Sequence, residues 1–136
     1  MCGRYSLGNV DTINSRFNLD IEEVYEVFPS NQILVKADSI FMVSWSFSPF
    51  WAKESIKLIN ARYETLKDKP SFKNTKRCGI FTNGWFEWKS IGGKKKPFYH
   101  FTNEEYFFLG GVYNQHGCVI VTKEAEGALR NIHNRM

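Results

Sequence analysis

Residues 77–90 read RCGIFTNGWFEWKS and carry the clearest signal for the fold. The stretch combines β-branched and aromatic residues, which are typical of strands that pack on one another. Asn83-Gly84 in its middle is a turn dipeptide and also a common site for a β-bulge. The stretch therefore predicts either two paired strands or one strand with an interruption.

Further strands are expected on both sides of this stretch. Apolar and β-branched segments bounded by turn residues lie at 32–36, 39–47, 97–101, 106–113 and 118–122. The segment IGGKKKP at 91–97 is typical of a hairpin turn with basic residues. The chain is thus expected to contain many short strands.

Helical signals are few and short. Within residues 10–18, Val10, Ile13 and Phe17 have helical spacing. Residues 56–68 predict a short strand that passes into a helix before Pro70, and residues 123–132 predict a short closing helix. Because few helical connections are long enough to join parallel strands, we expect an α+β fold that is mainly antiparallel, with a curved, barrel-like β core and a few short helices.

Length and composition favour one globular domain over residues 1–136. The hydrophobic content of 43% is typical of a globular protein, and no apolar stretch approaches the roughly 20 residues of a membrane-spanning helix. The N-terminus has no charged region followed by an apolar run, so a secretory signal is not expected. We therefore expect a soluble, cytoplasmic monomer without a membrane-bound form.

The charge and aromatic content favour an anionic partner. The chain has a net charge of +4 and 16% aromatic residues, and ring faces beside cations suit single-stranded nucleic acid. The sequence contains no GxxxxGK, GxGxxG, HExxH or GxSxG motif. Nucleotide hydrolysis, dinucleotide redox chemistry and the common hydrolase mechanisms therefore have no support.

The three cysteines do not suggest a metal site. Cys2, Cys78 and Cys118 leave an odd thiol if two pair, and none has CxxC or Cys/His spacing. Cys78 and Cys118 lie in the apolar runs CGIF and CVIV, which favours buried, inert thiols. We expect no disulfide, no metal and no cofactor.

Cys2 is the first candidate for chemistry because removal of Met1 would make it the N-terminus. A terminal cysteine carries an α-amine, with a reference pKa of about 7.7 to 8.0, beside a thiol with a pKa near 8.5. The amine can condense with an aldehyde to an imine, and the thiol can then close on the imine carbon to give a thiazolidine. The alternative is a semi-buried structural cysteine.

Three other positions carry polar groups suited to chemistry. Glu87 in GWFEWK either points to solvent or lines an aromatic pocket, where desolvation would let it exchange protons near neutral pH. His133 in IHNRM is either a packing residue or a functional imidazole. In NARYET, Asn60 lies beside Arg62, which either binds a phosphate or pairs with Glu64.

Four separated blocks resemble, in order, the signature of the SRAP (SOS response-associated peptidase) family, whose members process abasic sites in DNA. The blocks are MCGRY at 1–5, WAK at 51–53 followed by INARYET at 59–65, GWFEWK at 84–89, and IHNRM at 132–136. The resemblance runs from Cys2 to Met136. Relatives usually continue beyond this point, so we expect the chain to lack the C-terminal part that is usual in the family.

The resemblance implies a covalent link between protein and DNA. In this family the N-terminal cysteine reacts with the ring-opened aldehyde of an abasic site in single-stranded DNA and forms a thiazolidine that shields the lesion. Cys2 matches the nucleophile, and Asn60 matches the amide that positions the sugar. Glu87 matches the carboxylate that moves protons, and His133 matches the histidine associated with the aldehyde and with reversal of the crosslink.

The resemblance also implies the DNA-binding residues. Arg4 and Arg62 match arginines near the DNA backbone, and Trp45 occupies the place of an aromatic residue that stacks beside the lesion. The chain departs from the family at Glu26, where relatives usually have Asn, at Ser46, where they have Gly, and in lacking a proline before Gly84. Glu26 would oppose DNA binding if it faced the phosphates. A bacterial member would be associated with the nucleoid.

Other functions also use parts of this pattern. An N-terminal-nucleophile amidohydrolase or a thiol peptidase would also use Cys2, but the blocks around Glu87 and His133 are unexplained under the first reading. A non-catalytic module that binds single-stranded DNA would leave Cys2 without a role.

Overall fold

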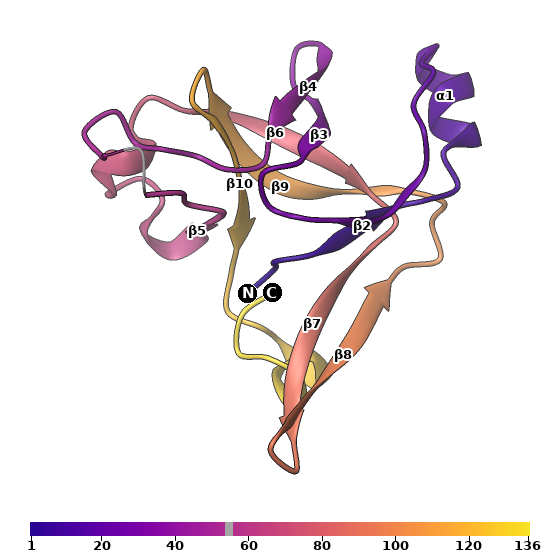
Figure 1. Cartoon of the computed structure of the whole chain (residues 1–136), viewed down its shortest axis with the longest axis vertical. Coiled ribbons are helices and arrows are strands. Elements are labelled where there is room, and N and C mark those ends of the chain that lie inside the picture. The colour runs from indigo at the N-terminus through magenta and orange to yellow at the C-terminus, as the bar shows by residue number, and fades with distance from the viewer. Residues whose placement is uncertain (54–55) are drawn as a thin grey trace.

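The computed structural model describes residues 1–53 and 56–136, whose strands form two sheets (Figure 1). The first sheet has the strand order β2-β1-β7-β8 and consists of β1 (Tyr5–Leu7), β2 (Val24–Val27), β7 (Gly84–Ile91) and β8 (Lys94–Phe101). The second sheet has the order β4-β3-β6-β9-β10-β5 and consists of β3 (Gln32–Lys36), β4 (Ile40–Ser44), β5 (Asn60–Arg62), β6 (Lys76–Thr82), β9 (Phe107–Asn114) and β10 (Gly117–Thr122).

The predicted fold class is confirmed. Within the described ranges, β5 and β10 form the one parallel pair, and the other paired strands are antiparallel. The sheets curve around the core but do not close into a barrel.

The helices are few and short, as predicted, but not all have the expected form. Helix α1 (Asp11–Phe17) lies inside the predicted range and buries Ile13. The helix expected near the end of 56–68 is reduced to the 3₁₀ turn η1 (Tyr63–Thr65), and a second 3₁₀ turn, η2 (Pro70–Phe72), follows outside that range. The closing helix is the 3₁₀ turn η3 (Gly127–Asn131). None of the described helices has the length and apolar character needed to cross a membrane.

Residues 77–90 run through two successive strands, β6 and β7, which are interrupted at Asn83 and belong to different sheets, so the alternative of two paired strands is wrong. The chain leaves the six-stranded sheet at the end of β6 and enters the four-stranded sheet at the start of β7. The hydroxyl of Thr82 bridges this point, because its oxygen lies 2.9 Å from the carbonyl oxygens of Ser6 and Gly84 and accepts from the Gly84 N–H at 3.1 Å. The long run of strand residues therefore joins the two sheets.

The β7–β8 hairpin carries the site residue Glu87 and closes with a two-residue turn. Gly92 and Gly93 have φ values of 58° and 77°, and Ile91 pairs with Lys94 across them. Positive φ at both central residues is what such a turn requires, and glycine adopts it without strain. The hairpin predicted for IGGKKKP is confirmed.

The core lies between the inner faces of the two sheets. Tyr5 from β1, Ile33 from β3 and Phe81 from β6 are almost fully buried in one cluster with Ile13 of α1. This packing fixes β1, and with it the residues that precede it in the chain.

Gly84 is required where the chain passes between the sheets. A Cβ at this position would collide with the His100 carbonyl oxygen and the Tyr99 ring. We expect Gly84→Ala to lower the free energy of unfolding by about 1–3 kcal/mol, as overpacking does. Gly110→Ala is the matched control, because its Cβ would lie 3.9 Å from the nearest atom, on Val121. Urea denaturation measures both, and an equal effect of the two variants would contradict this assignment.

Candidate site at the N-terminus

The two ends of the described chain lie side by side, next to strand β7 (Figure 1). The C-terminal residues fold back on the segment after β10, since Lys123 and Met136 exchange backbone hydrogen bonds of 2.7 and 3.0 Å. This pairing brings His133 to the N-terminus.

The α-amine of Met1 lies between a carboxylate and an imidazole. It is 3.0 Å from both carboxylate oxygens of Glu87 and 2.9 Å from Nδ1 of His133. The backbone N–H of Arg135 also donates to this Nδ1 at 3.0 Å, and the Arg135 carbonyl oxygen lies 3.1 Å from it. Glu87 is only 2% exposed, and the ammonium group compensates its buried charge. The structure thus places Glu87 in a pocket and not toward solvent.

A hydrogen bond to its backbone holds Cys2 in place, and its side chain is buried. The Asn60 amide donates to the Cys2 carbonyl at 2.9 Å, and the thiol lies 3.7 Å from the Arg4 carbonyl oxygen. Burial, and secondly the nearby Glu87 carboxylate, raises the pKa of the Cys2 thiol to about 12. The thiol is therefore protonated at neutral pH.

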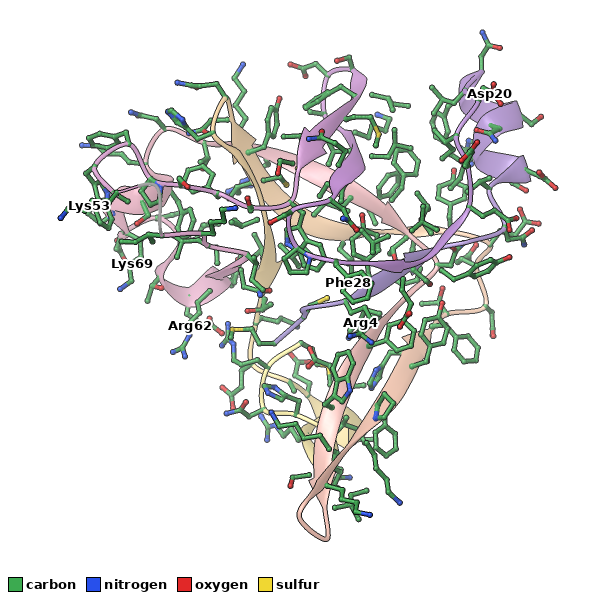
Figure 2. All side chains as sticks on the ribbon, viewed as in Figure 1. Arg4, Asp20, Phe28, Lys53, Arg62 and Lys69 are labelled. Carbon is green, nitrogen blue, oxygen red and sulfur yellow. The ribbon has the colours of Figure 1, made fainter. Side chains whose placement is uncertain are left out.

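Arg4 lies on one flank of the N-terminus. Its guanidinium stacks over the rings of Phe28 and Trp88, with 4.6 and 4.8 Å to their centroids, and Nη1 pairs with Glu26 at 3.0 Å (Figure 2). Glu26, which departs from the family pattern, thus forms an ion pair with Arg4. An approaching phosphate would otherwise contact this guanidinium. The Glu26 carboxylate and a phosphate would compete for Arg4.

Arg62 lies on the other flank and does not pair with Glu64. Both carboxylate oxygens of Glu64 instead accept from the Arg135 guanidinium at 2.9 Å. The hydrogen bond from Arg135 lowers the pKa of Glu64 to about 2. Arg62 projects from β5 away from the body of the protein (Figure 2) and lines a cleft of about 360 Å³ together with Lys69.

Sequence reasoning missed the role of Arg135. Its carbonyl oxygen lies 3.3 Å from the Met1 α-amine, and its guanidinium also donates to the Thr122 carbonyl at 2.7 Å. Arg135 thereby fixes the turn that presents His133. Its place in the IHNRM block, two residues after His133, was the available signal.

The structure does not support Trp45 as a residue that stacks beside a lesion. Its ring is fully buried against Tyr5, at 5.4 Å between centroids, and its indole N–H donates to the Ile59 carbonyl at 3.0 Å. The exposed rings lie a few residues further on, where Phe50 and Trp51 are 74% and 54% exposed. The sequence pattern did not separate these aromatic residues, because all lie in the same aromatic segment.

A cleft of about 550 Å³ opens at the N-terminus. It is lined by Met1, Gly3, Arg4, Glu87, Trp88, Lys95 and His133. Of the predicted site residues, Arg4, Glu87 and His133 line this cleft. Cys2 and Trp45 lie outside its lining, and Asn60 and Arg62 line the neighbouring cleft of about 360 Å³.

The remaining cysteines lie away from this cleft. Cys78 and Cys118 are free thiols with their sulfur atoms 3.8 Å apart, and Cys118 is fully buried. In residues 1–53 and 56–136, no group of three or more His, Cys, Asp or Glu side chains is placed to hold a metal ion.

The fold and the site together define a class of proteins in which polar side chains from distant parts of the chain surround the N-terminal amine. A model of the family described as SOS response associated peptidase (SRAP) matches residues 1–136. The chain therefore belongs to the SRAP family.

Relatives cover the full extent of the chain. The abasic site processing protein YoqW of Bacillus subtilis is 32% identical, over 100% of this chain and 74% of its own length. The abasic site processing protein YedK of Escherichia coli is 29% identical, over 99% of this chain and 73% of its own length. A crystal structure of a Bacteroides thetaiotaomicron protein has the same fold, with a TM-score of 0.84 and 24% identity over 99% of this chain and 75% of that one.

The raised pKa of Cys2 predicts a loss of stability in alkali. A pKa higher in the folded than in the unfolded state contributes stability that is complete below the unfolded pKa, near 9, and is lost as pH rises toward 12. We expect the protein with Met1 retained to lose roughly 2 kcal/mol more than Cys2→Ala between pH 9 and about 10.5, at ~1.4 kcal/mol per pH unit. Urea denaturation at each pH tests this, and parallel curves for the two proteins would contradict it.

Proposed function

We propose that this protein captures abasic sites in single-stranded DNA by a covalent crosslink through Cys2, after removal of Met1. One observation carries the proposal. The α-amine of Met1, the residue that precedes Cys2, is held 3.0 Å from the Glu87 carboxylate and 2.9 Å from Nδ1 of His133. The relatives named abasic site processing proteins support this choice of substrate.

The reaction needs only groups that the site and the lesion supply. Opening of the sugar hemiacetal frees an aldehyde, whose carbonyl carbon is attacked by the Cys2 amine. Loss of water gives an imine, and the thiol then adds across the C=N bond, with sulfur joining the carbon and the proton joining the nitrogen. The product is a thiazolidine, and no oxidant or reductant is consumed.

Glu87 is the proposed proton carrier for these steps. Ring opening requires a proton on the ring oxygen and removal of a hydroxyl proton, and one carboxylate within reach of both can serve as acid and base. Glu87 is buried beside the α-amine, and Nδ1 of His133 is a second acceptor at the same place. The Asn60 hydrogen bond to the Cys2 carbonyl would keep the new N-terminus in position when Met1 is gone.

Cations on both flanks would fix the DNA backbone. Arg4 lines the N-terminal cleft on one side, and Arg62 and Lys69 line the neighbouring cleft on the other. The exposed ring of Trp51 offers a face for an unpaired base. A strand that crosses the N-terminus would meet positive charge before and after the lesion.

The contacts of the site favour this reading over a thiol peptidase or an amidohydrolase. Glu87 and His133 both contact the terminal α-amine, and an amine is the group that condenses with an aldehyde, whereas the Cys2 thiol contacts the Arg4 carbonyl oxygen.

Covalent capture can be tested on a denaturing gel. The protein, with removal of Met1 verified by mass, is mixed with a labelled single-stranded oligonucleotide that carries one abasic site. We expect a shifted band that is absent with intact DNA and absent for Cys2→Ala. No band from folded protein that has lost Met1 would contradict the proposal.

Substitution of the carboxylate separates chemistry from binding. We expect Glu87→Gln to slow crosslinking about 10²-fold or more, the usual contribution of a general acid–base group, while noncovalent affinity changes little. Crosslinking rates and fluorescence anisotropy measure the two effects. Glu22→Gln, at an exposed position, is the control. An equal effect of Glu87→Gln on rate and affinity would exclude the acid–base role.

A further inference from the structure

Four aromatic residues share one face of the β7–β8 hairpin. Phe86 pairs with Tyr99 and Trp88 pairs with Pro97, so alternation places these side chains and Phe101 on the same face. Ring centroids are 6.2 Å apart for Trp88 and Phe86, 4.9 Å for Phe86 and Tyr99, and 5.8 Å for Tyr99 and Phe101. We call Trp88, Phe86, Tyr99 and Phe101 the aromatic ladder. Glu87 lies on the opposite, buried face of the same strand.

The aromatic ladder is accessible and begins in the N-terminal cleft. Tyr99 and Phe101 are 42% and 67% exposed, and Trp88 lines the cleft beside Met1. Exposed rings in contact with one another are uncommon on a protein surface that has no binding role. The aromatic ladder therefore continues the candidate site along the hairpin.

Charge along this face changes sign. Lys95 pairs with Ser90, so it shares the face of the ladder, and it lines the cleft with Arg4. At the far end, Glu104 and Glu105 line a pocket of about 310 Å³ with Phe101. The end near Cys2 thus attracts phosphate and the far end repels it.

We propose that the aromatic ladder, from Trp88 to Tyr99, binds the bases of the nucleotides on one side of the lesion, with Lys95 on a flanking phosphate. The proposal rests on the proposed function, because it extends the same DNA strand beyond Cys2. Stacked rings beside cations are the usual platform for single-stranded nucleic acid, and each base–ring contact is worth about 1–3 kcal/mol. The carboxylates of Glu104 and Glu105 set the end of the bound strand near Phe101.

Photo-crosslinking maps this strand directly. An oligonucleotide with one abasic site carries 5-iodouracil at each of the three positions on either side in turn, and adducts are located by mass spectrometry after irradiation. We expect adducts on Trp88, Phe86 or Tyr99 from one side of the lesion only. Covalent capture without adducts on the aromatic ladder would overturn this inference and leave the proposed function intact.

The same experiment with undamaged DNA separates the two proposals. Adducts on the aromatic ladder from undamaged DNA would support the binding surface, whereas absence of capture of the abasic oligonucleotide at Cys2 would contradict the proposed function. Adducts confined to other parts of the protein, or no binding of single-stranded DNA, would overturn the inference. Copurification of a protein partner that blocks the adducts would mean that the face binds protein instead.

Lys95 has a matched control on its own strand. Lys94 is also exposed but points to the opposite face, because neighbours on a strand alternate. We expect Lys95→Gln to weaken noncovalent binding several-fold at low salt and to reduce the slope of log K against log salt by about 0.7, the value for one contact to single-stranded DNA. Lys94→Gln should change the slope by much less. Equal changes would contradict a phosphate contact that is specific to Lys95.

Discussion

The contact between the α-amine of Met1 and the buried carboxylate of Glu87 constrains the whole candidate site. A carboxylate that is only 2% exposed requires a compensating partner, since desolvation of a lone charge costs several kcal/mol. The partner here is the start of the chain, 86 residues away. The N-terminus is thereby anchored on β7, and the residue that follows it lies beside the same carboxylate.

The supports of this contact come from distant parts of the chain. Arg135 fastens the C-terminal turn to Glu64 and Thr122, and this turn carries the imidazole of His133. Asn60 comes from β5, at the edge of the six-stranded sheet, while Glu87 comes from the four-stranded sheet. The site thus lies where the two sheets approach each other. The chain passes from one sheet to the other just before Gly84, and this connection fixes the two sheets relative to each other.

Burial gives the groups of the site different roles. The Cys2 thiol and the Glu87 carboxylate share a desolvated region, where the neutral thiol is favoured and the carboxylate depends on the ammonium group. Arg4 and Arg62 remain at the rims of clefts, where long-range attraction of phosphate is effective. The structure thus separates a buried thiol and a buried carboxylate from two flanking arginines.

The sequence alone determined most of the strands, the glycine turn of the β7–β8 hairpin and the family, because these depend on local alternation, backbone preference and short ordered blocks. It also singled out Cys2, Glu87 and His133 as carriers of chemistry. Only the tertiary structure decided which groups meet. In the folded chain, Glu64 pairs with Arg135, 71 residues away, and not with nearby Arg62. The tertiary structure also buried Trp45 and made Asn83 a crossing between sheets, because partners in space follow from sheet order and packing, which local spacing does not encode.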